Sequence, residues 1–321
     1  MAQPAKSPRD HGGGLDAAIA EFGGARADWI DLSTGINPEP YPVGEISAQA
    51  WEVLPDQNAQ RALVDAARQF WNVPDEAQII PAHGASAIIA RIPHLRPIGR
   101  VSIQTPTYNE HAAAFAAAGW EVLDHAATGI EAEVFVHPNN PDGRLANPQG
   151  AAPLTIIDES FCHVMPGQSL IAKSAAPGTI ILKSFGKFWG LAGLRLGFAI
   201  AHPETLENGA ASLNDLLGPW AASGPAIEIG TRALRDTIWA DEARARLAID
   251  AARLDALMAP HSALIGGTDL FRLYDVRDAT AFQNRLAKAH IWSRIFPYSQ
   301  SLIRLGLPKK SGWNQLETAL L

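Results

Sequence analysis

The sequence predicts an α/β fold, in which a large domain built on a mostly parallel sheet is followed by a smaller α+β domain. The chain has 321 residues, and a single hydrophobic core stops growing at roughly 250 residues. Short apolar runs alternate with alanine-rich helical stretches between residues 78 and 200, which is typical of a covered parallel sheet. After about Gly224 this alternation gives way to one long amphipathic pattern.

The N-terminal residues predict an arm over residues 1–36 that joins the small domain and the functional site. The first fourteen residues are rich in Pro, Gly and charge, and LDAAIAEFG then predicts a short helix that ends at Gly23 and Gly24. DLSTGINPEPYP (31–42) contains three prolines and a glycine, so we expect an irregular loop there.

The large domain is expected over residues 37–224 and the small domain over residues 225–321. The strands expected in the large domain are QIIPA (78–82), VSIQT (101–105), EVFVH (133–137), TIID (155–158), TIILK (179–183) and LGFAI (196–200). A helix from about Trp239 to Met258, apolar along one face, is expected to link the domains. The small α+β unit is predicted from LFRLYDV (270–276), a helix over 279–289, IWSRIF (291–296) and SLIRLGL (301–307).

Composition excludes several classes of partner. The formal net charge of −7 argues against a nucleic-acid partner, because such proteins need a basic surface. Cys162 is the single cysteine, and no Cys/His cluster with zinc spacing is present, so we expect neither a disulfide nor a metal. The N-terminus lacks the apolar core of a signal peptide, and no apolar stretch is long enough for a membrane span. We therefore expect a cytoplasmic protein without a membrane partner.

The densest block of unusual residues is LKSFGKFWGLAGLRLGF (182–198), which follows a predicted strand. A lysine in such a glycine-rich turn can reach an aldehyde, and removal from water would lower its pKa toward the nucleophilic free amine. Ser184 precedes Lys187 by three residues and Arg195 follows it by eight, and both could contact a phosphate. Lys183 lies close by, but only Lys187 keeps both spacings.

This block resembles the signature of the fold type I pyridoxal 5′-phosphate (PLP) enzymes, the aspartate aminotransferase superfamily. The resemblance implies a seven-stranded, mostly parallel sheet in the large domain. It also implies that Lys187 binds the cofactor aldehyde and that Ser184 and Arg195 hold the cofactor phosphate.

Two motifs upstream extend the resemblance. HPNNPDG (137–143) resembles the superfamily's Asn-Pro-x-Gly turn, which implies that Asn140 binds the cofactor's 3′-oxygen; an ordinary Asn-Pro turn is the alternative. TIIDES (155–160) ends a buried strand with Asp158, where the family's catalytic carboxylate pairs with the pyridine nitrogen. A buried carboxylate needs a cationic partner, although an Asp that caps the next helix would also fit.

Two further segments match the cofactor site. HGAS (83–86) opens an apolar helix, and Gly84, Ala85 and Ser86 resemble the family's phosphate loop; a Ser-capped helix fits almost as well. PTYNEH (106–111) places Tyr108 where relatives carry the aromatic ring that stacks on the pyridine.

The N-terminal HGGGLDAAIAEFG and STGIN segments resemble the threonine-phosphate decarboxylases of cobalamin biosynthesis. Phe161 strengthens this resemblance, because typical aminotransferases carry a tyrosine three residues after the aspartate; neutral drift is the alternative. The resemblance implies decarboxylation of L-threonine O-3-phosphate to (R)-1-amino-2-propanol O-2-phosphate and CO2. The implied substrate-binding residues are Gly35, Ile36, Asn37, Asn140, Arg294 and Arg304.

Arg304 matches the arginine that relatives use for the substrate carboxylate, and Arg294 matches one associated with the substrate phosphate. Outward-facing, solvated arginines are the alternative. A histidinol-phosphate-type aminotransferase is the rival enzyme, and a non-catalytic PLP-binding regulator is a more remote one. Because the relatives are homodimers, a homodimer that acts on a small phosphorylated amino acid is expected.

Overall fold

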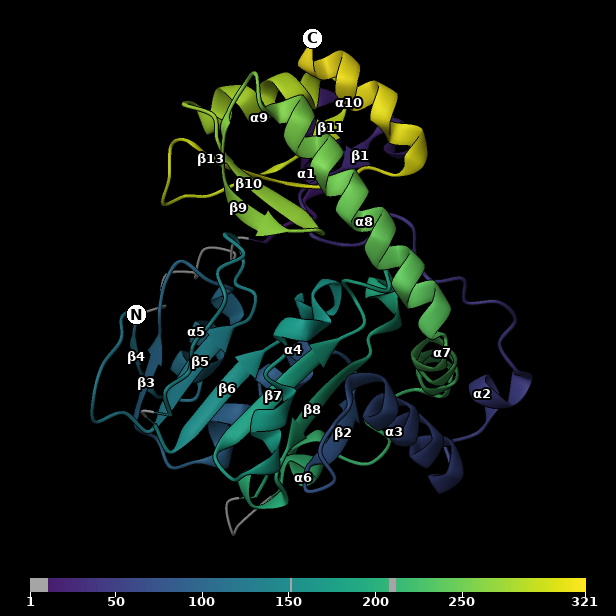
Figure 1. Cartoon of the computed structure of the whole chain (residues 1–321), viewed down its shortest axis with the longest axis vertical. Coiled ribbons are helices and arrows are strands. Elements are labelled where there is room, and N and C mark those ends of the chain that lie inside the picture. Colours follow the sequence, from purple (N-terminus) through teal and green to yellow (C-terminus); the bar gives the residue numbers. More distant parts are fainter. Residues whose placement is uncertain (1–10, 151, 208–211) are drawn as a thin grey trace, which may run out of the picture.

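The computed structural model describes residues 11–150, 152–207 and 212–321, and its larger part is a seven-stranded sheet (Figure 1). The strand order is β2-β8-β7-β6-β5-β3-β4. Only β8 runs antiparallel to its neighbours. The strands are β2 (Gln78–Ala82), β3 (Arg100–Ile103), β4 (Glu121–Leu123), β5 (Ala132–Val136), β6 (Leu154–Asp158), β7 (Thr179–Ser184) and β8 (Gly197–Ala201).

The apolar runs of the sequence locate six of these strands to within two residues at each end. The exception is β4, a three-residue strand at the sheet edge whose residues are exposed or only half-buried. Because an edge strand buries little, it carries no continuous apolar run, and periodicity alone did not reveal it. The mostly parallel seven-stranded sheet implied by the family resemblance is confirmed.

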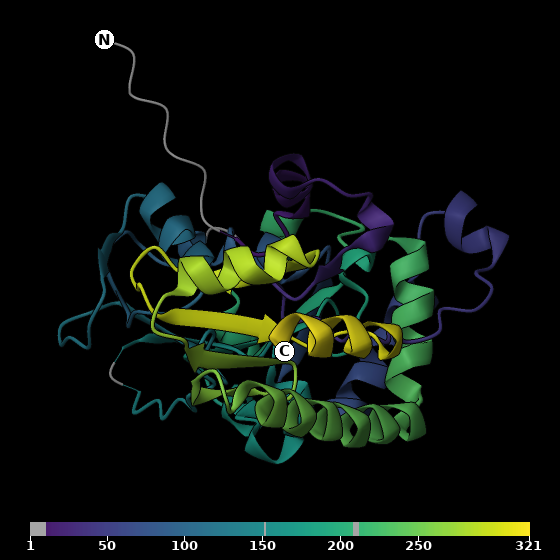
Figure 2. The ribbon, with the colours of Figure 1, turned by 90° about the horizontal axis from the view of Figure 1, so that it is seen from above.

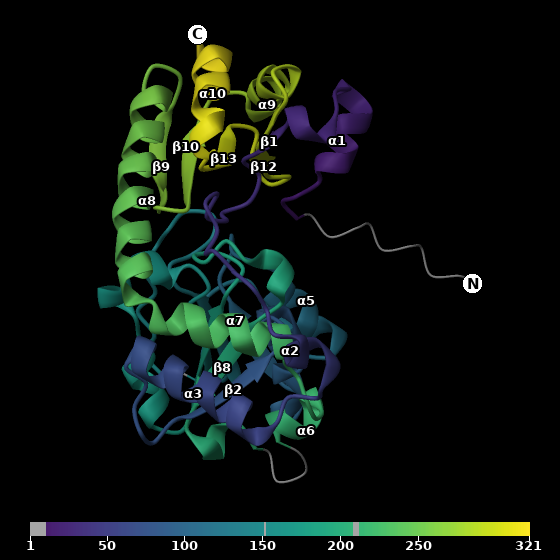
Figure 3. The same ribbon diagram turned by 90° about the vertical axis from the view of Figure 1, so that its right-hand side faces the viewer.

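Helices cover both faces of this sheet (Figures 1 and 3). One face packs against α3 (Gln57–Trp71) and α7 (Gly224–Arg235), and the other against α4 (Ala85–Ile89), α5 (Asn109–Ala117) and α6 (Leu213–Leu217). Alternate residues of the central strands therefore enter different cores; Ile157 and Ile181 belong to the first, and Ile156 and Ile180 to the second. Burial on both faces explains why these strands are almost uninterrupted apolar runs.

The long helix α8 (Thr237–Met258) connects α7 to the smaller part of the molecule (Figure 3). Its first turn is capped by Asp236, whose carboxylate accepts a hydrogen bond from the Trp239 backbone N–H at 3.0 Å. Leu247 and Leu254 are fully buried, as the amphipathic pattern predicts. None of the described helices is both long enough and apolar enough to span a bilayer.

The smaller part contains a four-stranded antiparallel sheet of order β12-β13-β10-β9. Helix α8 packs against β9 and β10, and α9 (Ala279–Lys288) packs against β12 and β13 (Figure 2). The last helix, α10 (Trp313–Leu320), contacts both α8 and α9. The strands are β9 (Ala263–Thr268), β10 (Phe271–Asp275), β12 (Arg294–Ile295) and β13 (Leu302–Gly306).

IWSRIF, which the sequence predicts as one strand, is divided at Ser293. Its first part, β11 (Ile291–Trp292), pairs in parallel with β1 (Ile30–Asp31), whereas its second part is β12 of the four-stranded sheet. This pairing brings the segment after α1 (Leu15–Phe22) onto the small sheet region and from there toward the large sheet. The domain boundaries at residues 36 and 224 stay predictions.

Candidate active site

A cavity of about 1290 Å³ lies at the carboxyl ends of the large sheet's strands, where the small sheet faces them. In open α/β sheets this edge is where ligands bind. Both sheets and the N-terminal segment contribute to its wall. The predicted site residues that line it are Gly35, Ala85, Ser86, Tyr108, Asn140, Asp158, Ser184, Lys187, Arg195, Arg294 and Arg304.

The loop after β7 holds Lys187 by means of its aromatic neighbours. Phe185, Phe188 and Trp189 are fully buried, and the rings of Phe185 and Trp189 stack with centroids 4.0 Å apart. Gly190 ends the turn in the left-handed region with φ of 67°. The apolar side chains thus anchor both sides of a lysine that itself faces the cavity.

Burial is the main cause that lowers the pKa of Lys187 to about 8, and the nearby guanidinium of Arg304 lowers it further. The carboxylate of Asp158 acts in the opposite direction. The amine lies 5.3 Å from the centre of the Phe161 ring. A larger share of the Lys187 amine is therefore neutral near neutral pH than for an ordinary lysine.

Lys183, the neighbouring lysine of the sequence motif, points into the protein interior instead. It forms a buried ion pair with Glu159, whose other oxygen accepts the Leu170 backbone N–H at 2.5 Å. Lys183 is not among the residues that line the cavity. The structure thus places Lys187 and not Lys183 at the site.

We expect Lys183→Met to lower the free energy of unfolding by about 3–5 kcal/mol, because it leaves the Glu159 carboxylate buried without a countercharge. Denaturant unfolding of the apoprotein measures this. Lys173→Met, at an exposed lysine, is the matched control and should change stability little. Equal effects of the two substitutions would contradict the importance of the pair.

Asp158 ends β6 at the floor of the cavity and is 2% exposed. One of its oxygens accepts a hydrogen bond from His111 Nε2 at 3.0 Å, and the other accepts the Ser160 backbone N–H at 2.9 Å and the Ser160 hydroxyl. Burial opposes ionisation, but the hydrogen bonds from His111 and Ser160 outweigh it and hold the pKa of Asp158 below its ordinary value. The carboxylate is therefore ionised.

His111 is a residue that sequence analysis missed. It lies on α5 and is 1% exposed, and its bond to Asp158 joins residues 47 positions apart. Because a carboxylate only accepts hydrogen bonds, His111 Nε2 must carry the proton. Its only trace in the sequence is a histidine on an alanine-rich helix, which is too common to indicate a functional residue.

The side of the cavity near α4 is suited to a phosphate. The side chains of Ser86, Ser184 and Arg195 line it, beside the backbone at the start of α4. Gly84 has φ of 94°, and a Cβ placed there would lie 2.7 Å from Arg195 Nη2. A Cβ at Gly197 would lie 2.3 Å from the Ala85 nitrogen. These glycines let the guanidinium and β8 approach the turn closely.

Tyr108 and Asn140 also line the cavity. Burial and the charges of Asp158 and Glu110 raise the pKa of Tyr108 to about 12, so its hydroxyl stays protonated. The Asn140 side-chain oxygen accepts a hydrogen bond from Arg304.

Two arginines from the small sheet complete the cavity. Arg304 on β13 is buried and donates to Asn140 and, at 2.6 Å, to the Ser33 carbonyl. Burial lowers the pKa of Arg304 to about 10, and Arg294 adds to this effect. Arg304 Nε is buried without a hydrogen-bond partner among the described residues. Such a group suits an anionic ligand.

The N-terminal segment crosses the cavity and contributes one expected residue, Gly35, together with His11, which was not among the predicted site residues. Gly35 passes between two rings, since a Cβ there would lie 2.8 Å from Phe271 and 3.0 Å from Phe161. His11, the first residue of the HGGG segment, also lines the cavity, and its carbonyl accepts a hydrogen bond from Arg294 at 2.8 Å.

Ile36, Asn37 and Gly84 are predicted site residues that do not line the cavity, and their binding roles stay predictions. Gly84 lies beneath the Arg195 guanidinium. Asn37 is buried and turns its amide toward the Phe188 carbonyl. The sequence gives the positions of these residues along the loops but not the direction of their side chains.

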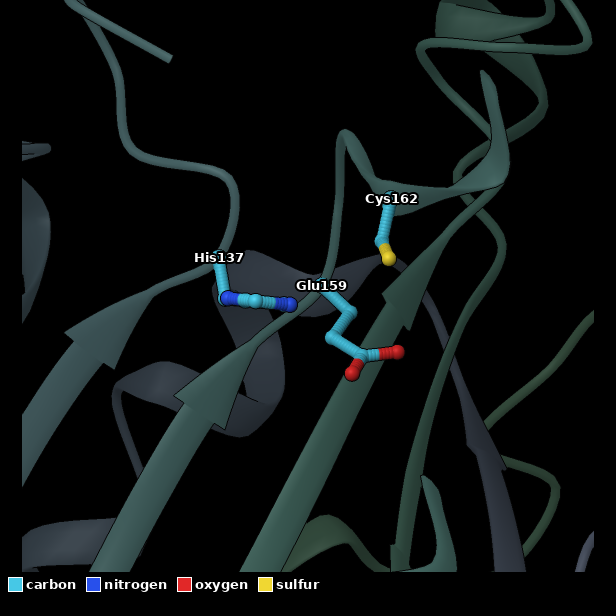
Figure 4. A group of neighbouring side chains, drawn as sticks. All are labelled: His137, Glu159 and Cys162. Atoms are coloured by element: carbon cyan, nitrogen blue, oxygen red, sulfur yellow. The ribbon is translucent and has the colours of Figure 1, made fainter. Parts of the chain in front are cut away.

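His137, Glu159 and Cys162 form a buried cluster behind the cavity, with possible metal-ligand atoms within 4.8 Å of one another (Figure 4). The histidine and the glutamate are already engaged. His137 Nδ1 accepts the Ala146 N–H at 2.9 Å, and Nε2 donates to the Gln168 carbonyl at 2.7 Å. Glu159 is bonded to Lys183 and to the Leu170 N–H, so the hydrogen bonds of both side chains serve the surrounding protein.

The chain is similar to characterised proteins over almost its full length. The aminotransferase class I and II family matches residues 28–311. Threonine-phosphate decarboxylases from Sinorhizobium sp and Pseudomonas aeruginosa are each 38% identical to it; the alignments cover 98% and 97% of this chain and the same shares of the relatives.

Among solved structures, the histidinol-phosphate aminotransferase of Sinorhizobium meliloti in complex with PLP superposes with a TM-score of 0.81 at 18% identity. The match covers 98% of this chain and 95% of that one, and it supports the fold alone. From the sequence matches, the chain belongs to the aminotransferase class I and II family and, within it, to the family of these two threonine-phosphate decarboxylases.

Proposed function

We propose that this chain is a PLP-dependent enzyme that decarboxylates L-threonine O-3-phosphate to (R)-1-amino-2-propanol O-2-phosphate and CO2, as part of cobalamin biosynthesis. One observation carries the proposal. A single cavity combines a partly buried lysine, an ionised carboxylate, a phosphate-type cradle and two arginines. The 38% identity to threonine-phosphate decarboxylases over the whole chain supports the choice of reaction.

The residues present fit PLP. Ser86, Ser184 and Arg195 would hold its phosphate, with the turn before α4 made narrow by Gly84 and Gly197. Asp158, kept ionised by His111 and Ser160, would pair with the ring nitrogen. When bound, PLP draws electrons away from the amino-bearing carbon of the substrate and so weakens the bonds to that carbon.

The protein's own residues bind and orient the substrate and move protons. Arg304 and Arg294 line the side of the cavity formed by the small sheet, so they suit a substrate with both a carboxylate and a phosphate. Their placement of the carboxylate selects which bond breaks. Lys187 Nζ, with its pKa of about 8, is the proton donor to Cα once CO2 has left.

The rival function is transamination of histidinol phosphate or a similar phosphorylated amine. The test supplies the purified protein with PLP and measures CO2 release from L-threonine O-3-phosphate. In parallel, it measures 2-oxoglutarate-dependent turnover of histidinol phosphate. Gas release without transamination is expected. Strong transamination without gas release would overturn the proposal in favour of the aminotransferase.

The pKa of Lys187 predicts how PLP binding depends on pH. Only the neutral amine attacks an aldehyde, and the pKa of Lys187 is lowered from 10.5 to about 8. Capture of PLP by the apoprotein should therefore accelerate as pH rises through about 8 and then level off. Stopped-flow absorbance measures this profile. Continued acceleration up to the ordinary lysine pKa would contradict the lowered value.

The homodimer expected for this family is also part of the proposal. Trp51 and Leu54, around α2 (Ala48–Glu52), are 68% and 61% exposed, and Val53 between them is also exposed. Val53 and Leu54 line a second cavity of about 620 Å³ beside α3 and α7. Contiguous exposed apolar side chains of this kind mark protein interfaces. Sedimentation should give a dimer, and Trp51→Glu should weaken it.

A further inference from the structure

The backbone of the Lys187 loop is held by a second segment, residues 37–41. The carbonyl of Lys187 accepts the Asn37 backbone N–H at 2.9 Å, and that of Trp189 accepts the Tyr41 N–H at 2.9 Å. Between them, the carbonyl of Phe188 accepts the Asn37 side-chain amide at 2.8 Å. Three consecutive carbonyls are thus satisfied by one short segment, which fixes their orientation.

At Gly190 the two segments lie so close together that only glycine, which has no side chain, fits between them. A Cβ on Gly190 would lie 2.8 Å from both the Asn37 carbonyl oxygen and Pro40 Cα. Gly190 has φ of 67°, which glycine alone adopts without strain. The loop therefore rests directly on the backbone of residues 37–40, and a shift in this segment must move the loop.

The other end of the Asn37 amide is bonded to the long helix. Its Oδ1 accepts Arg246 Nη2 at 2.8 Å and the Glu39 N–H at 3.0 Å. Arg246 lies on α8 and is itself paired with Asp250 at 3.4 Å. Since α8 packs on β9 and β10 of the small sheet, Asn37 bonds both the Lys187 loop and the helix that carries that sheet.

We propose that Asn37 is a positioning residue, which holds the Lys187 loop against α8 through the Phe188 carbonyl and Arg246 and does not bind substrate. This inference rests on the proposed function, in which Lys187 is the residue that captures PLP. It replaces the substrate contact expected from the STGIN segment. Asn37 is 2% exposed, lies outside the cavity wall and has its amide engaged at both ends.

The test compares Asn37→Ala, Asn37→Asp and Gln315→Ala. Gln315 is the matched control, since its amide also bonds backbone carbonyls, those of Ala289 at 2.8 Å and Asp28 at 3.1 Å, away from the cavity. Asn37→Asp keeps the acceptor for Arg246, replaces the donor to Phe188 with an oxygen that faces the Phe188 carbonyl, and adds a buried negative charge.

Asn37→Ala should reduce kcat on the order of 10- to 100-fold through misplacement of Lys187 and leave KM within about threefold. In the absence of substrate, the pH profile of PLP capture should shift upward from about 8, because a loosened loop admits water to the amine. Asn37→Asp should behave in the same way. Gln315→Ala should lower the melting temperature without changing either readout.

Each other outcome decides against the inference. If Asn37→Ala raised KM and left the pH profile of PLP capture unchanged, Asn37 would be a substrate-binding residue. A lower melting temperature alone, as in Gln315→Ala, would make its role merely structural. If Asn37→Asp behaved like the wild type, the hydrogen bond from Asn37 to the Phe188 carbonyl would not position the loop. If the wild-type protein captured no PLP, both the proposed function and this inference would be wrong. If the wild-type protein captures PLP normally, the variants test the role of Asn37 alone.

Discussion

Lys187→Ala should abolish CO2 release from L-threonine O-3-phosphate, with a loss on the order of 10³-fold or more. The variant removes both the nucleophile that captures PLP and the proton donor for Cα. The partly buried amine has no substitute, since Lys183 is occupied by Glu159. The measurement combines a CO2 assay with the visible absorbance of the protein after addition of PLP, and both signals should be lost.

Lys187→Arg and Lys173→Ala are the controls for this result. Arginine keeps the charge but cannot supply a neutral amine, so Lys187→Arg should also be inactive. Lys173 is exposed, and its loss should have no effect. A Lys187→Ala protein that still released CO2 at a tenth of the wild-type rate would refute the assignment of this lysine.

Asp158→Asn should reduce the decarboxylation rate on the order of 10²- to 10³-fold, because it removes the one charge placed to stabilise a cationic ring nitrogen. The substitution is nearly isosteric and keeps an acceptor for His111 Nε2, which lies 3.0 Å away. Folding should therefore be preserved. Single-turnover CO2 release measures the effect with PLP at saturation.

His111→Asn is the companion variant, because it leaves the carboxylate and removes its main hydrogen-bond donor. It should raise the pKa of Asp158, since the His111 bond is the largest cause that lowers it. Activity of this variant should fall at acidic pH and recover as pH rises. If Asp158→Asn retained full activity at every pH, the proposed role of the carboxylate would be wrong.

Local patterns of the sequence were enough to predict the lysine motif and the central strands. Ser184, Lys187 and Arg195 lie within twelve residues of one another, and the structure brings all three to one cavity. The central strands were visible because both of their faces are buried.

Contacts between distant parts of the chain were not visible. His111 meets Asp158 across 47 residues, and Asn37 meets Phe188 across 151 and Arg246 across 209. No periodicity encodes such pairs, since they depend on how the elements pack in space. Strand β9 was missed for another reason: its short apolar start is exposed and is followed by Gly266 and Gly267, which are typical of a turn.

The hydrogen bonds of Arg304 also determine how late in the synthesis of the chain the substrate site can form. This side chain joins Ser33, 271 residues earlier, to Asn140, 164 residues earlier. A nascent chain that has not yet released β13 from the ribosome lacks this junction, even if its large sheet has already formed. The substrate end of the pocket is therefore among the last features to mature, and a chain truncated before residue 304 would lack the arginine that joins Ser33 to Asn140.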